Sequence, residues 1–192
     1  MGVCCGVVGC FGRFGGGVVK EFVWCPVAAW LSVNLGVSPP VTPRMLEGVE
    51  GHSRVLEVLH GLGFGDARLL PPLASRRWPI VVAPDAYSPS RGALLEVKWV
   101  ARIDSRLYRV QALLYGVVAR ENGLRVERVG LVDAHRGRVL WFELDWGSFS
   151  IVERLVERVL ETVSRPLPPP VTQPPEKCLA CRWRRWCPER SV

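Results

Sequence analysis

The pattern of hydrophobic and polar positions is clearest around a predicted β-hairpin. Residues 79–83 form a short apolar run, and residues 88–92 after it are rich in serine, proline and glycine, which favour turns. In the second strand polar and apolar residues alternate, so Glu96 and Lys98 leave the same face. The hairpin would bring Asp85, which follows the first strand, close to Glu96.

Apolar residues at helical spacing predict four helices, and two further alternating runs predict strands. The helices are expected from Pro26 to just before Gly36 and over residues 43–62, 105–120 and 148–163. The strands are expected over residues 126–132 and 139–144. The order along the chain is therefore helix, helix, hairpin, helix, two strands and helix.

Composition indicates one globular domain with a polyanionic partner. The 192 residues, 48% of them hydrophobic, are enough for one sizeable core and few for two. The formal net charge of +7 favours nucleic acid over a membrane as the partner. No apolar run approaches the roughly 18 residues of a membrane-spanning helix, and the N terminus lacks the pattern of a signal peptide. We therefore expect a cytoplasmic protein.

The ends of the chain differ in composition from its middle. The expected organisation is a glycine-rich extension over residues 1–17 and one domain over residues 18–192, which includes a strap at 166–177 and a cysteine segment at 178–188. Six prolines make the strap extended and semi-rigid. The extension contains three cysteines without an assigned role, Cys4, Cys5 and Cys10.

The expected neighbourhood of Asp85 and Glu96 has the chemistry of a divalent metal site. Carboxylate oxygens suit Mg²⁺ and Mn²⁺, and a nearby ammonium at Lys98 can orient a water molecule or stabilise charge on a phosphorus centre. Only three of the 25 basic residues are lysine, so a position that keeps lysine has a use for a compact ammonium. The alternative is a solvated strand face with a cross-strand ion pair.

Three polar residues on predicted helices are further candidates. His52 falls in the middle of the apolar stripe of the helix over residues 43–62. Gln111 and Tyr115 are spaced i, i+4, so they share one side of a later helix, next to its apolar stripe. Each has a structural alternative: a hydrogen-bonded core histidine in the first case, and two polar tips at the rim of the core in the second.

A cysteine array lies near the C-terminal end. Cys178, Cys181 and Cys187 form a C-x2-C-x5-C arrangement, and in a cytoplasmic protein metal or cluster binding explains it better than disulfides do. A tetrahedral zinc or cubane iron-sulfur site needs a fourth thiolate, and Cys25 is the best-placed candidate. Spacing alone leaves zinc and iron-sulfur both open, and three unrelated thiols are the alternative.

Together these motifs resemble those of the RecB-type nucleases of the PD-(D/E)xK superfamily. More narrowly, the chain resembles the CRISPR-associated RecB-like exonuclease family, the fourth of the Cas proteins, from about residue 21 to residue 188. The matching motifs are Cys25-Pro26, Gly48 with His52, Pro84-Asp85, Glu96-Val97-Lys98, Gln111 with Tyr115, and the closing Cys178, Cys181 and Cys187. Val27 departs from the pattern, because an arginine often follows the first Cys-Pro in that family.

The resemblance implies a fold, two cofactors and a set of site residues. The fold is a restriction-endonuclease-like α/β core, a mixed central sheet flanked by helices, with the cysteine segment docked on the N-terminal helix region. Mg²⁺ or Mn²⁺ would be bound by His52, Asp85, Glu96 and the Val97 carbonyl. Catalytic roles would fall to Lys98, Gln111 and Tyr115. A [4Fe-4S] cluster would be held by Cys25, Cys178, Cys181 and Cys187.

The function that follows from the resemblance is metal-dependent DNA exonuclease activity on single-stranded ends. It would trim spacer precursors in CRISPR adaptation, and the CRISPR integrase complex is a candidate partner. One rival is a general repair or replication nuclease with the same core. A second rival, outside the enzymes, is a cluster-bearing DNA-binding subunit of an integration complex whose catalytic residues are vestigial.

Overall fold

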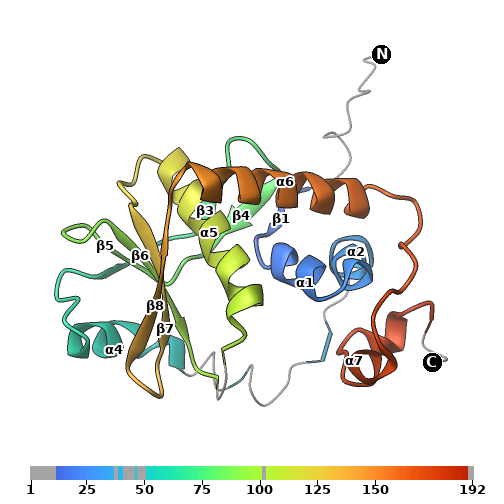
Figure 1. Ribbon diagram of the computed structural model, residues 1–192, viewed down its shortest axis with the longest axis horizontal. Helices are drawn as coiled ribbons and strands as arrows, with labels where there is room; N and C mark the ends of the chain where they lie inside the picture. The colour runs from blue at the N-terminus through green and yellow to red at the C-terminus, as the bar shows by residue number, and fades with distance from the viewer. Residues whose placement is uncertain (1–11, 37–38, 41–45, 47–50, 101–102, 190–192) are drawn as a thin grey trace.

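The computed structural model describes residues 12–36, 39–40, 46, 51–100 and 103–189. These residues form a mixed α/β fold with two sheets and helices on both faces of the larger one (Figure 1). The order of helices and strands agrees with the α/β class expected from the sequence. The gaps remove Gly48 and the first part of the helix predicted over residues 43–62 from the description.

The larger sheet has five strands in the order β2-β5-β6-β7-β8. The strands are β2 (Arg68–Leu69), β5 (Ala86–Ser88), β6 (Ala93–Lys98), β7 (Arg128–Asp133) and β8 (Arg138–Glu143). The central pair β6 and β7 is parallel, and the other neighbours are antiparallel. The chain makes the parallel connection through α5 (Ser105–Glu121), as a crossover between parallel strands requires.

The predicted hairpin is correct in its second strand but not in its first. The run at residues 79–83 becomes β4 (Ile80–Val82), which belongs to a separate three-stranded sheet between β1 (Phe14–Gly15) and β3 (Leu73–Ala74). The strand that pairs with β6 is β5, with Ala86 opposite Leu95. Asp85 therefore directly precedes the hairpin, and the expectation that it lies near Glu96 is met.

The described part of the glycine-rich extension is built into the fold, contrary to the boundary expected at residue 18. Phe14 pairs in parallel with Ile80, and the Gly16 N–H donates to the Val81 carbonyl at 2.7 Å. A Cβ at Gly16 would lie only 2.9 Å from the Tyr115 ring, so only glycine allows this approach. Residues 1–11, with Cys4, Cys5 and Cys10, lie outside the described part of the chain.

Helices cover the five-stranded sheet on both faces. On one face a core forms between the sheet, α1 (Val18–Trp24), α5 and α6 (Trp146–Val163), and on the other face α4 (Val55–Gly61) packs on a smaller core. Asp104 and Asp145 cap α5 and α6, because their carboxylates accept hydrogen bonds from Arg106 N–H at 3.1 Å and Ser148 N–H at 2.7 Å. Along β6, Leu94 belongs to the first core, whereas Leu95 and Val97 belong to the second. Because side chains alternate along a strand, Glu96 and Lys98 lie on the same face as Leu94, which is the α5 face.

The second predicted helix is interrupted after His52. Residues 53–54 form a turn, and α4 begins only at Val55, so the stripe of apolar residues does not continue through His52. Val55 and Leu59 are buried, whereas the His52 side chain is 62% exposed. The expectation that His52 occupies the buried face is therefore wrong.

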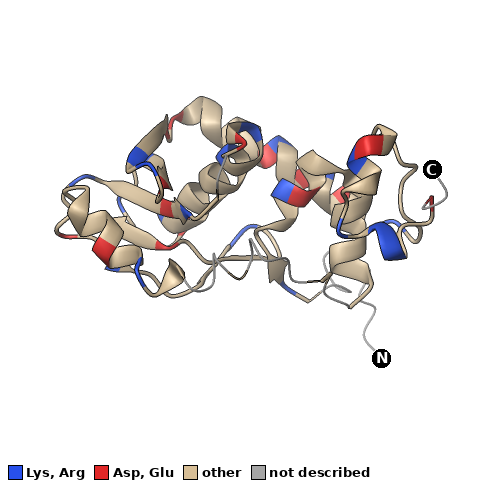
Figure 2. Ribbon diagram, turned by 90° about the horizontal axis from the view of Figure 1, so that it is seen from below, with Lys and Arg blue, Asp and Glu red and all other residues tan. Residues whose placement is uncertain are grey.

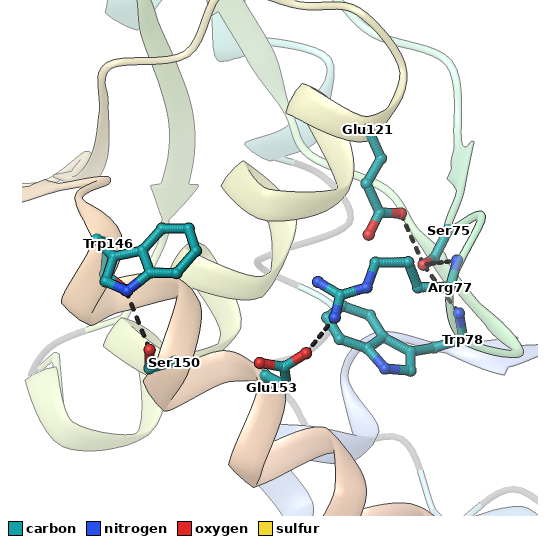
Figure 3. A network of polar contacts seen from close by, with 7 residues as sticks. All are labelled: Ser75, Arg77, Trp78, Glu121, Trp146, Ser150 and Glu153. Carbon is teal, nitrogen blue, oxygen red and sulfur yellow. Dashed lines mark hydrogen bonds and ion pairs between the residues drawn. The ribbon is translucent and has the colours of Figure 1, made fainter.

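A polar network fixes the loop between β3 and β4 against two helices (Figure 3). Glu121, at the end of α5, accepts hydrogen bonds from Ser75 Oγ at 2.8 Å and from the Arg76 N–H at 2.9 Å. The Arg77 guanidinium pairs with Glu153 of α6. This network holds the smaller sheet, and with it the segment that leads to Asp85, on the helical layer.

The C-terminal segment lies beside the first helices, although the sequence separates them widely (Figure 1). It contains α7 (Pro175–Leu179) and a 3-10 turn (Arg184–Trp186), and Trp183 packs with residues of α2 (Pro26–Asn34). Basic positions occur along this segment and around the sheet (Figure 2). Among the described residues, no helix is both long enough and apolar enough to cross a membrane.

Candidate active site and cysteine site

Asp85 is held at the entrance to the hairpin by the backbone of β6. Its Oδ2 accepts a hydrogen bond from the Val97 N–H at 2.7 Å, and its Oδ1 lies 3.4 Å from His52 Nε2. A cavity of about 180 Å³ opens here, and His52, Asp85, Val97, Lys98 and Trp99 are among the residues that line it. Burial raises the pKa of Asp85, although Lys98, the Val97 N–H and His52 oppose the increase.

Glu96 and Lys98 form a buried ion pair on the same face of β6, as the strand alternation predicts. Lys98 Nζ donates a hydrogen bond to Glu96 Oε1. Burial raises the pKa of Glu96, and the nearby Asp85 carboxylate adds to the increase while Lys98 opposes it. Burial alone would lower the pKa of Lys98, but the carboxylate of Glu96 outweighs it, so that pKa is raised and the ammonium stays charged.

Gln111 and Tyr115 meet on α5, as their spacing predicts. Gln111 Nε2 donates to the Tyr115 hydroxyl at 2.9 Å, and both side chains are buried. Burial raises the pKa of Tyr115, and the negative charge of Glu96 raises it further, so the phenol stays protonated. Tyr115 and Glu96 line the same small pocket, which places this pair beside the β6 carboxylate.

The donor set at this site fits a hard divalent cation. Glu96 Oε2 and Gln111 Oε1 are buried and have no hydrogen-bond partner among the residues that the structure describes. Burial also raises the pKa of both nearby carboxylates, those of Asp85 and Glu96, and a divalent cation would compensate their charge. Within the described ranges, no group of three or more His, Cys, Asp and Glu side chains is arranged to hold a metal ion. A cation would therefore take further ligands from backbone, water or substrate.

Two residues near this site, Lys20 and Tyr108, carry no role in the sequence analysis. Lys20 of α1 and Lys98 place their ammonium groups 5.1 and 5.2 Å from the centre of the Tyr108 ring. Burial lowers the pKa of Lys20 to about 8, and the charge of Lys98 contributes to the decrease. The scarcity of lysine is the one sequence signal that includes Lys20, and nothing in its local pattern connects it with the hairpin.

The four cysteines proposed as cluster ligands line one cavity. Cys25, at the start of α2, is buried, and Cys178, Cys181 and Cys187 of the C-terminal segment are partly buried. All four are free thiols. The structure therefore brings thiols from the two ends of the described chain together, with Trp24 and Trp183 also lining the cavity.

Hydrogen-bond donors point to two of these sulfurs. Burial raises the pKa of Cys181, while the Trp183 N–H and the Trp24 side chain donate to its sulfur and oppose the increase. Burial likewise raises the pKa of Cys187, and the Glu189 N–H opposes it. Burial outweighs these donors, so both pKa values are raised in the protein without a cluster, whereas the donors would favour the thiolate, the form that binds metal.

One of three comparisons with known proteins points to a nuclease. No protein-family model matches the chain. A curated relative described as CRISPR-associated exonuclease Cas4, from Thermoproteus tenax, is 26% identical over 176 residues, which cover 88% of this chain and 90% of the relative. The protein SSO0001, known from a crystal structure, aligns with a TM-score of 0.49 and 16% identity, covering 92% of this chain and 86% of its own. The similarity to the curated relative supports a nuclease of the Cas4 and RecB-like kind.

Proposed function

We propose that this chain is a metal-dependent DNA exonuclease that acts on single-stranded ends. The observation that carries the proposal is the buried group formed by Asp85, Glu96 and Lys98, in which carboxylates and an ammonium converge beside an open cavity. A curated relative that aligns along 90% of its own length is named as an exonuclease. The formal net charge of +7 also suits DNA, a polyanionic substrate.

In this proposal Asp85, Glu96 and the Val97 carbonyl would hold the divalent cation, and the exposed His52 side chain, which the described structure does not place with both carboxylates around one ion, would join them when the cation binds. Bound Mg²⁺ or Mn²⁺ supplies Lewis-acid polarisation of the phosphoryl oxygen and lowers the pKa of bound water. Lys98, kept charged by Glu96, would hold the attacking water and stabilise negative charge on the phosphorus centre. The hydrogen bond to Tyr115 fixes the Gln111 amide, and its Oε1, which has no partner among the described residues, would accept a hydrogen bond that positions a group in the site.

We further propose that Cys25, Cys178, Cys181 and Cys187 hold a [4Fe-4S] cluster. The thiols line one cavity, yet the described side chains are not arranged around a single metal ion. A cubane has one iron for each thiolate, so its ligands stand farther apart than the four ligands of one zinc ion. The donors to Cys181 and Cys187 suit thiolate ligands. The cluster would join the C-terminal segment to α2.

Cleavage of end-labelled linear and circular single-stranded DNA tests the activity. Anaerobically purified protein with Mn²⁺ should shorten the linear strand from an end and leave the circle intact, and EDTA should stop the reaction. Cleavage of the circle would show an endonuclease instead. DNA binding without any cleavage would favour the cluster-bearing binding subunit.

The biological setting follows from a second experiment. We propose that the enzyme trims spacer precursors in CRISPR adaptation, because the relative is described as CRISPR-associated. Trimming that stops at a short motif beside the spacer, only when an integrase complex is present, would support this setting. Trimming indifferent to both would favour a general repair nuclease.

A further inference from the structure

A groove next to the candidate active site has not yet been given a role. It measures about 470 Å³ and lies between α1, the first turns of α5 and the C-terminal segment. Its lining includes Lys20, Trp24, Leu107, Tyr108, Arg182 and Trp183. Tyr108 also contacts Lys98 through its ring, so the groove begins where the ion pair of β6 ends.

All three lysines of this arginine-rich chain border the groove or its aromatic walls. Lys20 and Lys98 lie over the Tyr108 ring, and Lys177 Nζ lies 5.0 Å from the centre of the Trp24 ring. An ammonium is a compact point charge with three rotatable donors, whereas a guanidinium is a larger planar fork. The restriction of lysine to this region indicates a ligand with single anionic oxygens at close range.

Among the described residues, Lys20 is the cation of the groove that forms no close ion pair, although the charges of Glu96 and Glu21 act on it from farther away. Glu21, its neighbour, is paired with Arg182 at 2.8 Å. The Lys20 ammonium instead lies over the Tyr108 ring. Burial disfavours its charged form, which a bound anion would stabilise. The indole N–H of Trp183, buried in the same lining, also has no partner among the described residues.

We propose that this groove is the binding subsite for the substrate strand next to the cleavage centre, and that Lys20 binds a phosphate adjacent to the one attacked. The inference rests on the proposed function, because it takes the centre at Lys98 as the place of cleavage. Tyr108, flanked by both ammonium groups, would contact the nucleotide between the two phosphates. Alternating cations and aromatic rings match the alternating phosphates and bases of a single strand.

Binding of a labelled single-stranded 12-mer in EDTA tests the groove without requiring cleavage. Lys20→Met keeps most of the aliphatic stem and removes the charge, and we expect about tenfold weaker binding, as for loss of one charge-assisted contact. Arg138→Ala serves as the matched control, because it removes an exposed positive charge on β8, outside the groove lining. It should change binding far less. Equal losses in the two variants would reduce Lys20 to a general surface charge.

Strands with a single neutral methylphosphonate linkage provide the second arm. In the wild-type protein one linkage position should weaken binding, and in Lys20→Met the neutral linkage at that position should cost nothing further. An identical penalty profile in both proteins would overturn the proposal, whether or not Lys20→Met is fully stable. Absence of Mn²⁺-dependent cleavage, with this profile intact, would instead refute the proposed function and leave the binding subsite.

Discussion

The candidate active site and the cysteine site are built from opposite kinds of sequence information. The first takes Asp85, Glu96 and Lys98 from one short stretch of chain that folds into a hairpin. The second gathers Cys25 with three cysteines of the C-terminal segment, and so closes a loop across most of the chain. A site made by neighbouring residues depends on local strand geometry, whereas a site made by distant residues depends on the complete fold.

This difference leads to different expectations for mutations. The side chains of the hairpin project from a sheet that has its own hydrophobic core, so their loss should affect chemistry more than folding. The cysteines lie in a small separate hydrophobic core that joins α2 to the C-terminal segment. Their loss should first weaken the packing of the C-terminal segment on α2. Each prediction below would weaken or refine this contrast.

The largest effect is expected from Asp85→Ala and Glu96→Ala. Each removes a proposed metal ligand, and cleavage should fall by at least about 100-fold, more than is usual for the loss of a group that only orients a ligand. Thermal stability should be largely retained in Asp85→Ala, because the loss of one of two nearby buried carboxylates relieves repulsion, whereas Glu96→Ala leaves the Lys98 ammonium without its ion-pair partner and should melt at a lower temperature. Mn²⁺-dependent rates and thermal melts check both parts. Nearly normal cleavage in either variant would refute the proposed metal site.

Lys98→Arg should reduce cleavage by about 100-fold, the lower end of what a positioned proton-transfer or charge-stabilising group contributes. The charge is retained, but the planar guanidinium differs in size and shape from the compact ammonium that pairs with Glu96, so it would not hold water in the same position. Arg138→Lys, at an exposed position of β8 outside the site and the groove, is the control for exchange of one cation for the other and should retain most activity. A fully active Lys98→Arg variant would make Lys98 a structural partner of Glu96 only.

Loss of the cysteine site should have an intermediate effect on activity and a larger effect on stability. Cys25→Ala and Cys187→Ala should behave alike, since each would remove one ligand of the same cluster. Both proteins should lose the brown colour and iron content, and their melting temperature should fall by at least about 5 °C. If the wild-type protein is colourless, free of iron and binds zinc, the four cysteines hold zinc and not an iron-sulfur cluster.

Removal of residues 1–11 separates the remaining cysteines from this site. The truncated protein should keep its colour and activity, because the proposed ligand set does not include Cys4, Cys5 or Cys10. Removal of residues 1–17 should be harmful, since it deletes β1 and the contact between Gly16 and Tyr115. Loss of colour in the shorter truncation would mean that the fourth ligand is not Cys25.

The smallest effect concerns Asp66, which joins the loop after α4 to the hairpin. Its carboxylate accepts hydrogen bonds from Ser88 Oγ at 2.6 Å and from the Ser90 N–H at 2.7 Å, and these bonds lower its pKa to about 2. A carboxylate whose folded pKa is lowered adds stability above its unfolded pKa of about 4, and this stability is lost as the pH falls towards 2. Asp66→Asn should therefore lower the melting temperature at pH 7, and the difference should shrink between pH 4 and pH 2.

A constant difference in melting temperature across that pH range would show that the Asp66 charge contributes nothing. The matched control is Glu57→Gln, because Glu57 of α4, within the described part of the chain, forms its ion pair with the exposed Arg54 that precedes this helix. Such an exposed pair contributes little to stability, so this variant should melt close to the wild-type temperature throughout.

The sequence predicted the parts of the fold that depend on local pattern. Alternation in β6 placed Glu96 and Lys98 on one face, and the i, i+4 spacing of Gln111 and Tyr115 produced their hydrogen bond. It failed where tertiary pairing decides. The run at Ile80 has the same apolar pattern as a hairpin strand. It forms β4, which pairs with the strands of Phe14 and Leu73 and not with β6.

Two other features lay beyond local pattern for similar reasons. The sequence pattern predicts an apolar stripe that continues through His52, but the turn after His52 interrupts the helix and leaves the side chain exposed beside Asp85. Lys20 reaches Tyr108 only because α1 packs against α5, which no spacing within the chain indicates. Cys25 was the best-placed candidate for a fourth thiolate and was also implied by the resemblance to a family, but neither indicated how the fold brings it to the distant cysteines.

Binding of Mn²⁺ in the absence of DNA tests most directly the claim that the two convergent carboxylates form a divalent metal site. Electron paramagnetic resonance of free Mn²⁺ during titration gives the affinity and the number of sites for wild type, Asp85→Asn, Glu96→Gln and the exposed control Glu157→Gln. We predict one site in the wild type and in Glu157→Gln, with binding weakened at least about tenfold in the other two variants. Equal Mn²⁺ binding in all four proteins would contradict the account.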